Sequence, residues 1–219
     1  MTDLEMVLNL RRMRHLRRCN TLPTISDEDV AQHSYFVTML AMSIGDEYNT
    51  YATEHNVGYH PLDAENQMDE LKMEVVLRKA LCHDMEETFV SDIPWNIKHA
   101  DDETHTMFEK VIQKHMDLVF EGTSSLQIQR DMNKACKDSL EGELVNVADM
   151  LELGMYSWEE YAQGNKSMKR MLDKTVKLIK TYNLSSVLMN SSPLFKAILN
   201  LLENPSAAGT VAEYIYHID

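Results

Sequence analysis

Apolar residues recur at intervals of three and four along most of the chain, the spacing of one face of an α-helix. The pattern predicts six helices, over residues 2–18, 26 to about 48, 68–87, 101–120, 140–163 and 166 to about 182. Two short helices are expected after Pro193, separated near Asn204 and Pro205. Residues 50–67 are weakly periodic, which predicts a loop or a short helical excursion. Ser26 followed by Asp29 resembles a capping box at the start of the second helix.

Turn-forming residues are scarce, since the 219 residues include only 7 Gly and 5 Pro. This scarcity favours long helices joined by short loops over many-stranded sheets. The 16 Met are good helix formers and adaptable core residues. No repeat, low-complexity tract or linker interrupts the chain. We therefore expect an all-α fold in one domain, residues 1–219, with 166–219 as a C-terminal helical extension.

The formal net charge of −14 argues against a nucleic-acid polymer as the partner, because the field of the protein would repel it. A small anionic substrate is still compatible with this charge, because one cation or one basic cluster can reverse the sign of a cleft. Such a cluster stands near the start of the chain: Arg11, Arg12, Arg14, Arg17 and Arg18. A solvated basic helix face is an equally good interpretation of this cluster.

The cysteines are three in number and widely spaced, at Cys19, Cys82 and Cys136. Their spacing predicts reduced thiols and a cytoplasmic protein. The N-terminal residues do not resemble a secretory signal, and no apolar stretch is long enough to span a bilayer, so no membrane partner is expected.

Four residues within apolar helical segments are candidates for chemistry. His33 falls on the apolar face of its predicted helix, His83 and Asp84 are adjacent in LCHDMEE, and Asp149 stands in LVNVADMLELG. A carboxylate in such surroundings is costly unless it is paired or binds a cation. Two imidazoles and two carboxylates suit a divalent Mn, Fe, Co, Ni or Zn ion, with Mg²⁺ also possible.

Each of these residues alone also has a structural interpretation. A single histidine on an apolar helix face is usually a core residue, and a single aspartate is often a cap or an ion-pair partner. The order His, His-Asp, Asp on three separate helices is a stronger signal than any one of its members.

The sequence resembles the HD-domain metal-dependent phosphohydrolases, in the branch of the bacterial 5′-deoxynucleotidases and the phage deoxynucleoside triphosphatases. The segments that carry the resemblance are RRCNTLPTISDEDVAQHS (17–34), CHDMEETFVSDIPWNIK (82–98) and LVNVADMLELGMYSWEEYAQGN (144–165). The resemblance implies an HD-domain helical bundle that binds about one divalent ion per chain. It also implies a nucleotide substrate and association into a dimer or higher homo-oligomer.

The resemblance implies a role for each matching residue. His33, His83, Asp84 and Asp149 match the metal ligands, and Glu87 matches the acid that orients or deprotonates the attacking water. Further residues match substrate contacts: Arg18 and Lys98 for phosphate, Asp92 for the sugar or the leaving-group proton, and Pro94 for the pocket wall. Ser34 matches the second residue of an HS pair, although a local helix hydrogen bond is the simpler interpretation.

Two features depart from the pattern of the family. Cys19 stands where the deoxynucleotidase has a tryptophan that helps exclude ribose, which puts selection for deoxyribose in question. His99, His105 and His115 could hold a second metal, but we expect them at the surface because the single-metal set is complete.

The favoured function is a 5′-nucleotidase that releases phosphate from deoxynucleoside monophosphates. A triphosphohydrolase acting on a dNTP, for example dATP, uses the same residues and is the main alternative. A two-metal HD oxygenase or cyclic-nucleotide phosphodiesterase would need two of the extra histidines on the inner wall. A non-catalytic helical interaction protein would lack a ligand or Glu87, and all of these residues are present.

Overall fold

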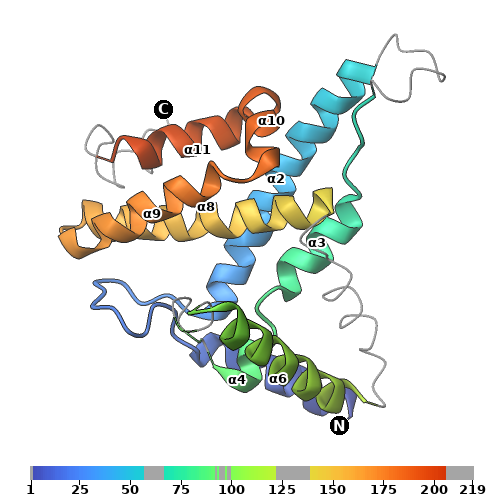
Figure 1. Ribbon diagram of the computed structural model, residues 1–219, viewed down its shortest axis with the longest axis vertical. Coiled ribbons are helices and arrows are strands. Elements are labelled where there is room, and N and C mark those ends of the chain that lie inside the picture. The colour runs from blue at the N-terminus through green and yellow to red at the C-terminus, as the bar shows by residue number, and fades with distance from the viewer. Residues whose placement is uncertain are drawn as a thin grey trace. The chain divides into compact units, whose positions relative to one another are not determined.

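The computed structural model describes residues 2–56, 67–91, 93, 97, 100–121 and 139–205 (Figure 1). All regular elements of these residues are helices, apart from one isolated antiparallel bridge between Arg17 and Asp29. The predicted all-α fold is therefore confirmed. The chain forms two compact units, each described by itself: Met1–Tyr35 with Arg78–Ala135 (unit 1), and Phe36–Leu77 with Cys136–Asp219 (unit 2). Organisation as a single domain stays a prediction.

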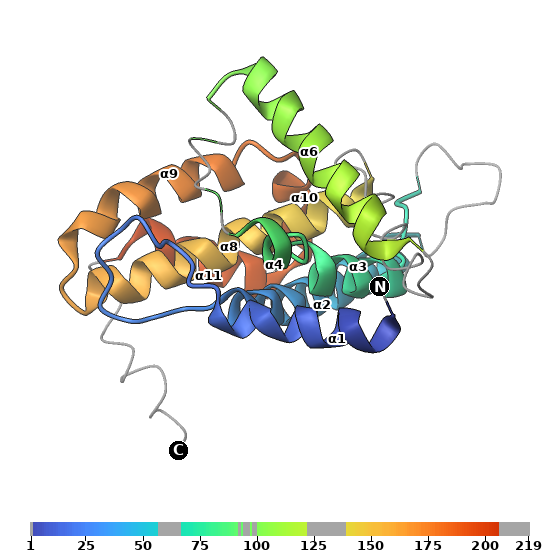
Figure 2. The same ribbon diagram turned by 90° about the horizontal axis from the view of Figure 1, so that it is seen from below.

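Unit 1 contains α1 (Asp3–Leu10), the 3₁₀ helix η1 (Arg11–His15), α4 (Glu87–Val90) and α6 (Asp102–Phe120), which are labelled in Figure 2 except for η1. Its small core is a cluster of apolar side chains in which methionine predominates. Met6, Met85 and Met116 are buried there, and the partly buried residues around them are Leu10, Cys82, Phe89 and Ile112. Flexible methionine side chains suit such a junction because they adapt to irregular gaps between helices.

The first predicted helix was too long. The α-helix begins with a capping box between Thr2 and Glu5, but it ends at Leu10 and continues only as a 3₁₀ turn to His15. Four arginines follow Leu10 within seven residues. Like charges three and four residues apart destabilise a further helical turn, which accounts for the early end.

The second helix, α2 (Val30–Asn56), begins later and ends later than predicted. The Asp29 carboxylate accepts the Gln32 N–H at 2.9 Å, so Asp29, and not Ser26, caps the helix. The last turns of α2 are stabilised because the side-chain amide of Asn56 forms two hydrogen bonds of 2.9 Å with the backbone of Met68.

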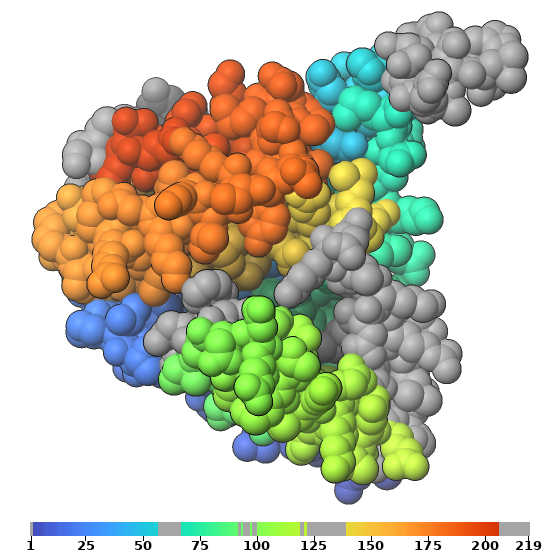
Figure 3. Space-filling view, in the orientation of Figure 1, coloured from blue at the N-terminus to red at the C-terminus, as the bar shows by residue number. Residues whose placement is uncertain are grey.

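Unit 2 is built around α8 (Leu140–Ala162), against which α9 (Lys169–Ile179), α10 (Asn183–Ser191) and α11 (Pro193–Glu203) pack. The buried face of α8 includes Leu144, Val147, Ala148 and Leu151. The short 3₁₀ helix η3 (Lys166–Met168) leads into α9, whose outer face lies at the surface (Figure 3). The predicted boundaries of α6 and α8 agree with the structure to within one residue.

The sequence pattern did not predict α10, because its nine residues NLSSVLMNS include three serines and two asparagines. Tertiary contacts support this helix. A Glu143 carboxylate oxygen accepts the Leu184 N–H at 3.0 Å in its first turn. The second short helix expected after Pro205 lies outside the described residues. Among the described residues, every helix is too short or too polar to span a lipid bilayer.

Asn49 joins α2 to the segment before α3 (Met73–Cys82). Its amide nitrogen donates to the Leu71 carbonyl at 2.9 Å, and its amide oxygen accepts the Leu71 N–H at 2.7 Å. Asn49→Ala should lower the free energy of unfolding by about 2 kcal/mol, because two partly buried backbone groups lose their partner. Urea unfolding of this variant beside Thr50→Ala, which alters an exposed residue of the same helix, checks the expectation. Equal midpoints for the two variants would contradict it.

Candidate metal centre

His83 and Asp84 lie in a turn, not within a helix as predicted. The predicted helix 68–87 is α3, which spans only Met73–Cys82; residues 83–86 form turns and Glu87 begins α4. The turns are closed by backbone hydrogen bonds from Met85 N–H to Cys82 and from Glu87 N–H to Asp84. A turn at this point releases two adjacent polar side chains from helical spacing, so both can face the same point.

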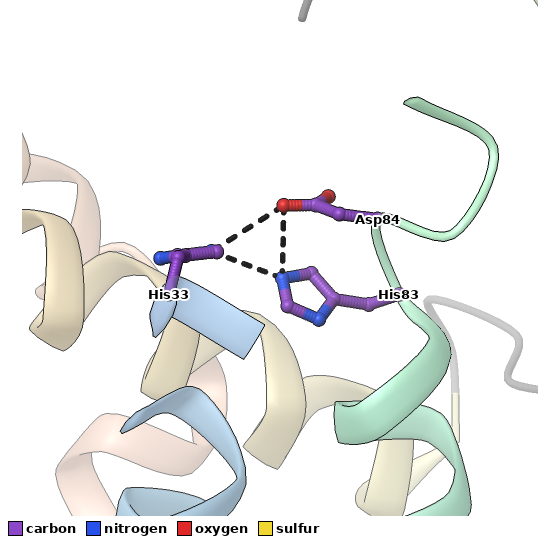
Figure 4. Close-up of side chains that lie close together, drawn as sticks. All are labelled: His33, His83 and Asp84. Carbon is purple, nitrogen blue, oxygen red and sulfur yellow. Dashed lines mark hydrogen bonds and ion pairs between the residues drawn. The ribbon is translucent and has the colours of Figure 1, made fainter. Parts of the chain in front are cut away.

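His33, His83 and Asp84 converge in unit 1 (Figure 4). The two Nε2 atoms of the histidines are 3.1 Å apart. The Asp84 Oδ2 atom lies 3.4 Å from the first and 3.3 Å from the second. His33 is fully buried, as its place on the apolar face of α2 predicts, while His83 and Asp84 have side-chain exposures of 11% and 19%. The three atoms thus form a nearly equilateral triangle that is partly open to solvent.

This triangle fits a divalent ion. Nitrogen and oxygen ligands at about 2.0–2.2 Å from one cation, in tetrahedral or octahedral geometry, are about 2.8–3.6 Å from each other. All three observed separations fall within that interval. The close approach of two ring nitrogens also requires a proton or a cation between them, because two facing lone pairs repel. The donor set and its spacing therefore suit a metal.

The tautomer of His83 favours the same conclusion. Its Nδ1 atom lies 2.7 Å from the carbonyl oxygen of Ala80, which can only accept a hydrogen bond. The Nδ1 atom must therefore carry the proton, and the neutral ring presents the Nε2 lone pair to the triangle. A backbone carbonyl behind a ligating histidine is the usual arrangement that orients such a ring.

The same Asp84 oxygen also contacts a guanidinium, since Arg18 Nη1 lies 3.3 Å from Oδ2. Burial alone would raise the pKa of Asp84, but His83, His33 and Arg18 outweigh it and hold the pKa well below its ordinary value. Asp84 is therefore an anion at neutral pH. Arg18, with 14% of its side chain exposed, is placed beside the triangle.

Three other predicted residues belong to unit 1. Glu87 is half-buried at the first residue of α4. The Ser34 hydroxyl donates to the Val30 carbonyl at 2.9 Å, so the local helix hydrogen bond is present. Cys19 has a φ of 51°, in the left-handed region that residues other than glycine seldom adopt.

Asp149 belongs to unit 2, in the middle of α8, and its part in the site stays a prediction. Within that unit, burial and then the charges of Asp149 and Glu143 raise the pKa of Tyr182. The predicted substrate residues Asp92, Pro94 and Lys98 lie outside the described residues.

Of the three additional histidines, the two that the structure describes, His105 and His115, make their contacts away from the triangle. His115 is exposed and its ring packs against Phe89, as expected of a surface position. His105 is one quarter exposed, and its Nε2 atom lies 3.0 Å from a Glu109 carboxylate oxygen. His99 lies outside the described residues. Among the described residues of unit 1, His33, His83 and Asp84 form a group of three donors that could hold a metal ion.

Sequence reasoning missed one residue of this site. Glu28 is buried, and its Oε2 atom lies 3.9 Å from Arg18 Nε. The only signal in the sequence is its place between Asp27 and Asp29, an acidic run that is typical of an exposed turn.

Most of the chain is similar to a known protein family. Residues 5–196 match the family described as 5′-deoxynucleotidase YfbR-like. No curated protein sequence matches the chain.

Solved structures share the fold at low sequence identity. An HD-domain phosphohydrolase from Listeria innocua has a TM-score of 0.67 at 19% identity, covering 94% of this chain and 97% of its own. A protein from Pyrococcus horikoshii OT3 has a TM-score of 0.65 at 21% identity, covering 90% and 99%. The cyanophage S-2L HD phosphohydrolase DatZ, bound to dA and one catalytic Zn²⁺ ion, has a TM-score of 0.58 at 14% identity, covering 88% and 95%.

The family match spans most of the chain, the fold is that of HD-domain phosphohydrolases, and the triangle of donor atoms suits a metal. The chain therefore belongs to the YfbR-like 5′-deoxynucleotidase family and is a metal-dependent hydrolase of phosphate esters.

Proposed function

We propose that this enzyme is a 5′-nucleotidase that hydrolyses deoxynucleoside monophosphates to the nucleoside and inorganic phosphate. The observation that carries the proposal is the triangle of His33, His83 and Asp84 with Arg18 beside it. A cation site next to a guanidinium is suited to a phosphate group, because both neutralise its negative charge.

His33, His83 and Asp84, together with Asp149 from α8, would hold one divalent ion of the Mn, Fe, Co, Ni or Zn type, with Mg²⁺ a weaker fit. Such an ion lowers the pKa of a water molecule and polarises a phosphoryl oxygen. The solved structure of DatZ, which is similar in fold, holds one catalytic Zn²⁺ ion and dA. It supports the binding of a single metal ion and of a substrate that contains deoxyribose.

The chain's own residues supply the remaining steps. Arg18 donates hydrogen bonds from its planar guanidinium to two phosphate oxygens and stabilises the charge that develops on them. Glu87, close to Asp84 along the chain, orients the attacking water and accepts its proton. As the bond between phosphorus and the 5′ oxygen breaks, Asp92 contacts the sugar and helps supply the proton to the leaving oxygen. Lys98 adds a second positive charge, and Pro94 shapes the wall of the pocket.

Hydrolysis of a deoxynucleoside triphosphate to nucleoside and triphosphate is the second candidate. It is favoured by Arg11, Arg12 and Arg14, which are exposed and have no carboxylate partner among the described residues. These cations offer more positive charge than one phosphate requires.

A panel of ribo- and deoxynucleotides tests the proposal. Mono-, di- and triphosphates are incubated with each divalent ion, phosphate is detected with malachite green, and triphosphate is detected by anion-exchange chromatography. We expect phosphate from deoxynucleoside monophosphates; triphosphate as the only product would favour the second candidate. The ratio of deoxy to ribo turnover also shows whether Cys19 still permits exclusion of ribose.

We further infer that the enzyme works as a dimer or higher homo-oligomer in the cytoplasm, with a nucleotide as its small-molecule partner. Unit 1 exposes large apolar side chains on two of its helices, at Leu4, Val7 and Leu8 of α1 and at Met107, Val111 and Leu118 of α6. Apolar residues gathered on exposed helix faces are typical of association surfaces. Cys19 and Cys82 are thiols in the structure, which agrees with a reducing compartment. Light scattering of the purified chain measures its oligomeric state.

A further inference from the structure

The segment that carries Arg18 is paired with the segment before α2. The Arg18 N–H donates to the Glu28 carbonyl at 2.9 Å, and the Val30 N–H donates to the Leu16 carbonyl at 3.0 Å. Between these bonds lies the antiparallel bridge of Arg17 and Asp29. Arg18 and Glu28 are therefore opposite each other. Side chains alternate along each segment, so these two share one side of the ribbon.

Burial distinguishes the two sides of this ribbon. Arg18 and Glu28 have side-chain exposures of 14% and 10%, whereas Arg17 is 47% exposed. Arg17 forms its own ion pair at 2.9 Å with Asp27, which is 79% exposed. One side thus carries an ordinary surface ion pair, and the other side places a nearly buried acid next to the arginine of the site.

The Arg18 guanidinium lies between two carboxylates. Its Nη1 atom is 3.3 Å from Asp84 Oδ2, and its Nε atom is 3.9 Å from Glu28 Oε2. Burying a carboxylate costs free energy unless a positive charge compensates it. The Arg18 guanidinium, 3.9 Å from Glu28, is such a charge. The two carboxylates differ in one respect. Asp84 also belongs to the donor triangle, so a cation bound there would neutralise part of its charge.

We propose that Glu28 is the positioning residue of Arg18, an inference that rests on the proposed nucleotidase function. Glu28 holds the Nε side of the guanidinium when the charge of Asp84 is engaged by the cation. The terminal nitrogens are then directed at the substrate phosphate. Without this anchor the long arginine side chain samples many rotamers, and each binding event must select the productive one. Glu28 therefore acts on substrate affinity through Arg18.

A double-mutant cycle tests the assignment. The KM and kcat for a deoxynucleoside monophosphate are measured for the wild type and for Glu28→Gln, Glu28→Asp, Arg18→Ala and the double variant Arg18→Ala/Glu28→Gln. We expect Glu28→Gln to raise KM about tenfold with a much smaller change in kcat, and Glu28→Asp to restore part of the affinity. In the Arg18→Ala background the same change should alter KM less than about twofold, because its target is already absent.

Asp27→Asn is the matched control, since it neutralises an exposed acid one residue away that pairs with Arg17. Its KM should stay within about twofold of the wild type. Melting temperature and metal content are recorded for every variant. An equal effect of Glu28→Gln with and without Arg18, or a loss of metal in place of a change in KM, would overturn the proposal. If Glu28→Gln does not fold, Glu28→Asp in both backgrounds gives the same comparison.

Calorimetry with inorganic phosphate separates this proposal from the proposed function. If the metal-loaded wild type binds phosphate but hydrolyses no nucleoside monophosphate, the nucleotidase proposal fails. The role of Glu28 is then decided by binding alone, with about tenfold weaker phosphate affinity expected for the Glu28 variant. Unchanged phosphate affinity in that variant would end the positioning role.

Discussion

Replacing His83 by alanine is expected to abolish hydrolysis and to remove the bound divalent ion while leaving the fold intact. The Nε2 atom of His83 is one corner of the donor triangle, 3.1 Å from His33 Nε2 and 3.3 Å from Asp84 Oδ2. Without it, three predicted ligands remain and the charge of Asp84 is less well compensated. We expect the metal content to fall from about one ion per chain to less than about a tenth. Inductively coupled plasma mass spectrometry and phosphate release measure the two effects.

His115→Ala is the control for that experiment, because His115 is exposed and packs against Phe89 away from the triangle. It should keep both metal and activity. His83→Ala with a full complement of metal and normal turnover would contradict the assignment of the site.

The second large effect is expected from Glu87→Gln, which should lower kcat about a hundredfold or more while metal content is unchanged. Glu87 follows Asp84 by three residues and begins α4, and its carboxylate is the proposed acceptor of the water proton. The amide of glutamine has a similar shape but cannot accept that proton. Single-turnover hydrolysis of the deoxynucleoside monophosphate isolates the chemical step.

The neighbouring Glu86→Gln provides the comparison, since it removes the same charge from the adjacent residue of the same turn. A loss of activity of equal size in both variants would show that the general acidity of this turn matters, and that Glu87 has no particular role. A loss of metal in Glu87→Gln would instead make Glu87 a ligand.

Much of the fold follows from the sequence, and the errors have physical causes. The periodic patterns of α6 and α8 fix their boundaries because each begins with a polar cap, Asp101 and Ser139, before a regular apolar face. The segment around His83 was mistaken for a continuing helix because HDMEE contains good helix formers. Its turn depends on packing of Met85 against Met6 and Met116, which come from distant parts of the chain.

In the site, too, local sequence patterns predict some residues, and contacts between distant segments determine others. The ligand-like residues His33, His83 and Asp84 were predicted because each is a polar residue within an apolar segment, and the structure brings them together. Glu28 was missed because its burial depends on pairing with a segment ten residues earlier, which leaves no periodic signal. Asp92, Pro94, Lys98 and Asp149 stay predicted site residues.

The most direct test of the metal centre is anomalous X-ray scattering at the cobalt edge from crystals of the protein grown with Co²⁺. We predict one dominant peak at about 2.0–2.3 Å from His33 Nε2, His83 Nε2, Asp84 Oδ2 and the carboxylate of Asp149. A dominant peak elsewhere, or a peak that Asp84 and the two histidines do not share, would contradict the metal centre on which the proposed hydrolysis depends.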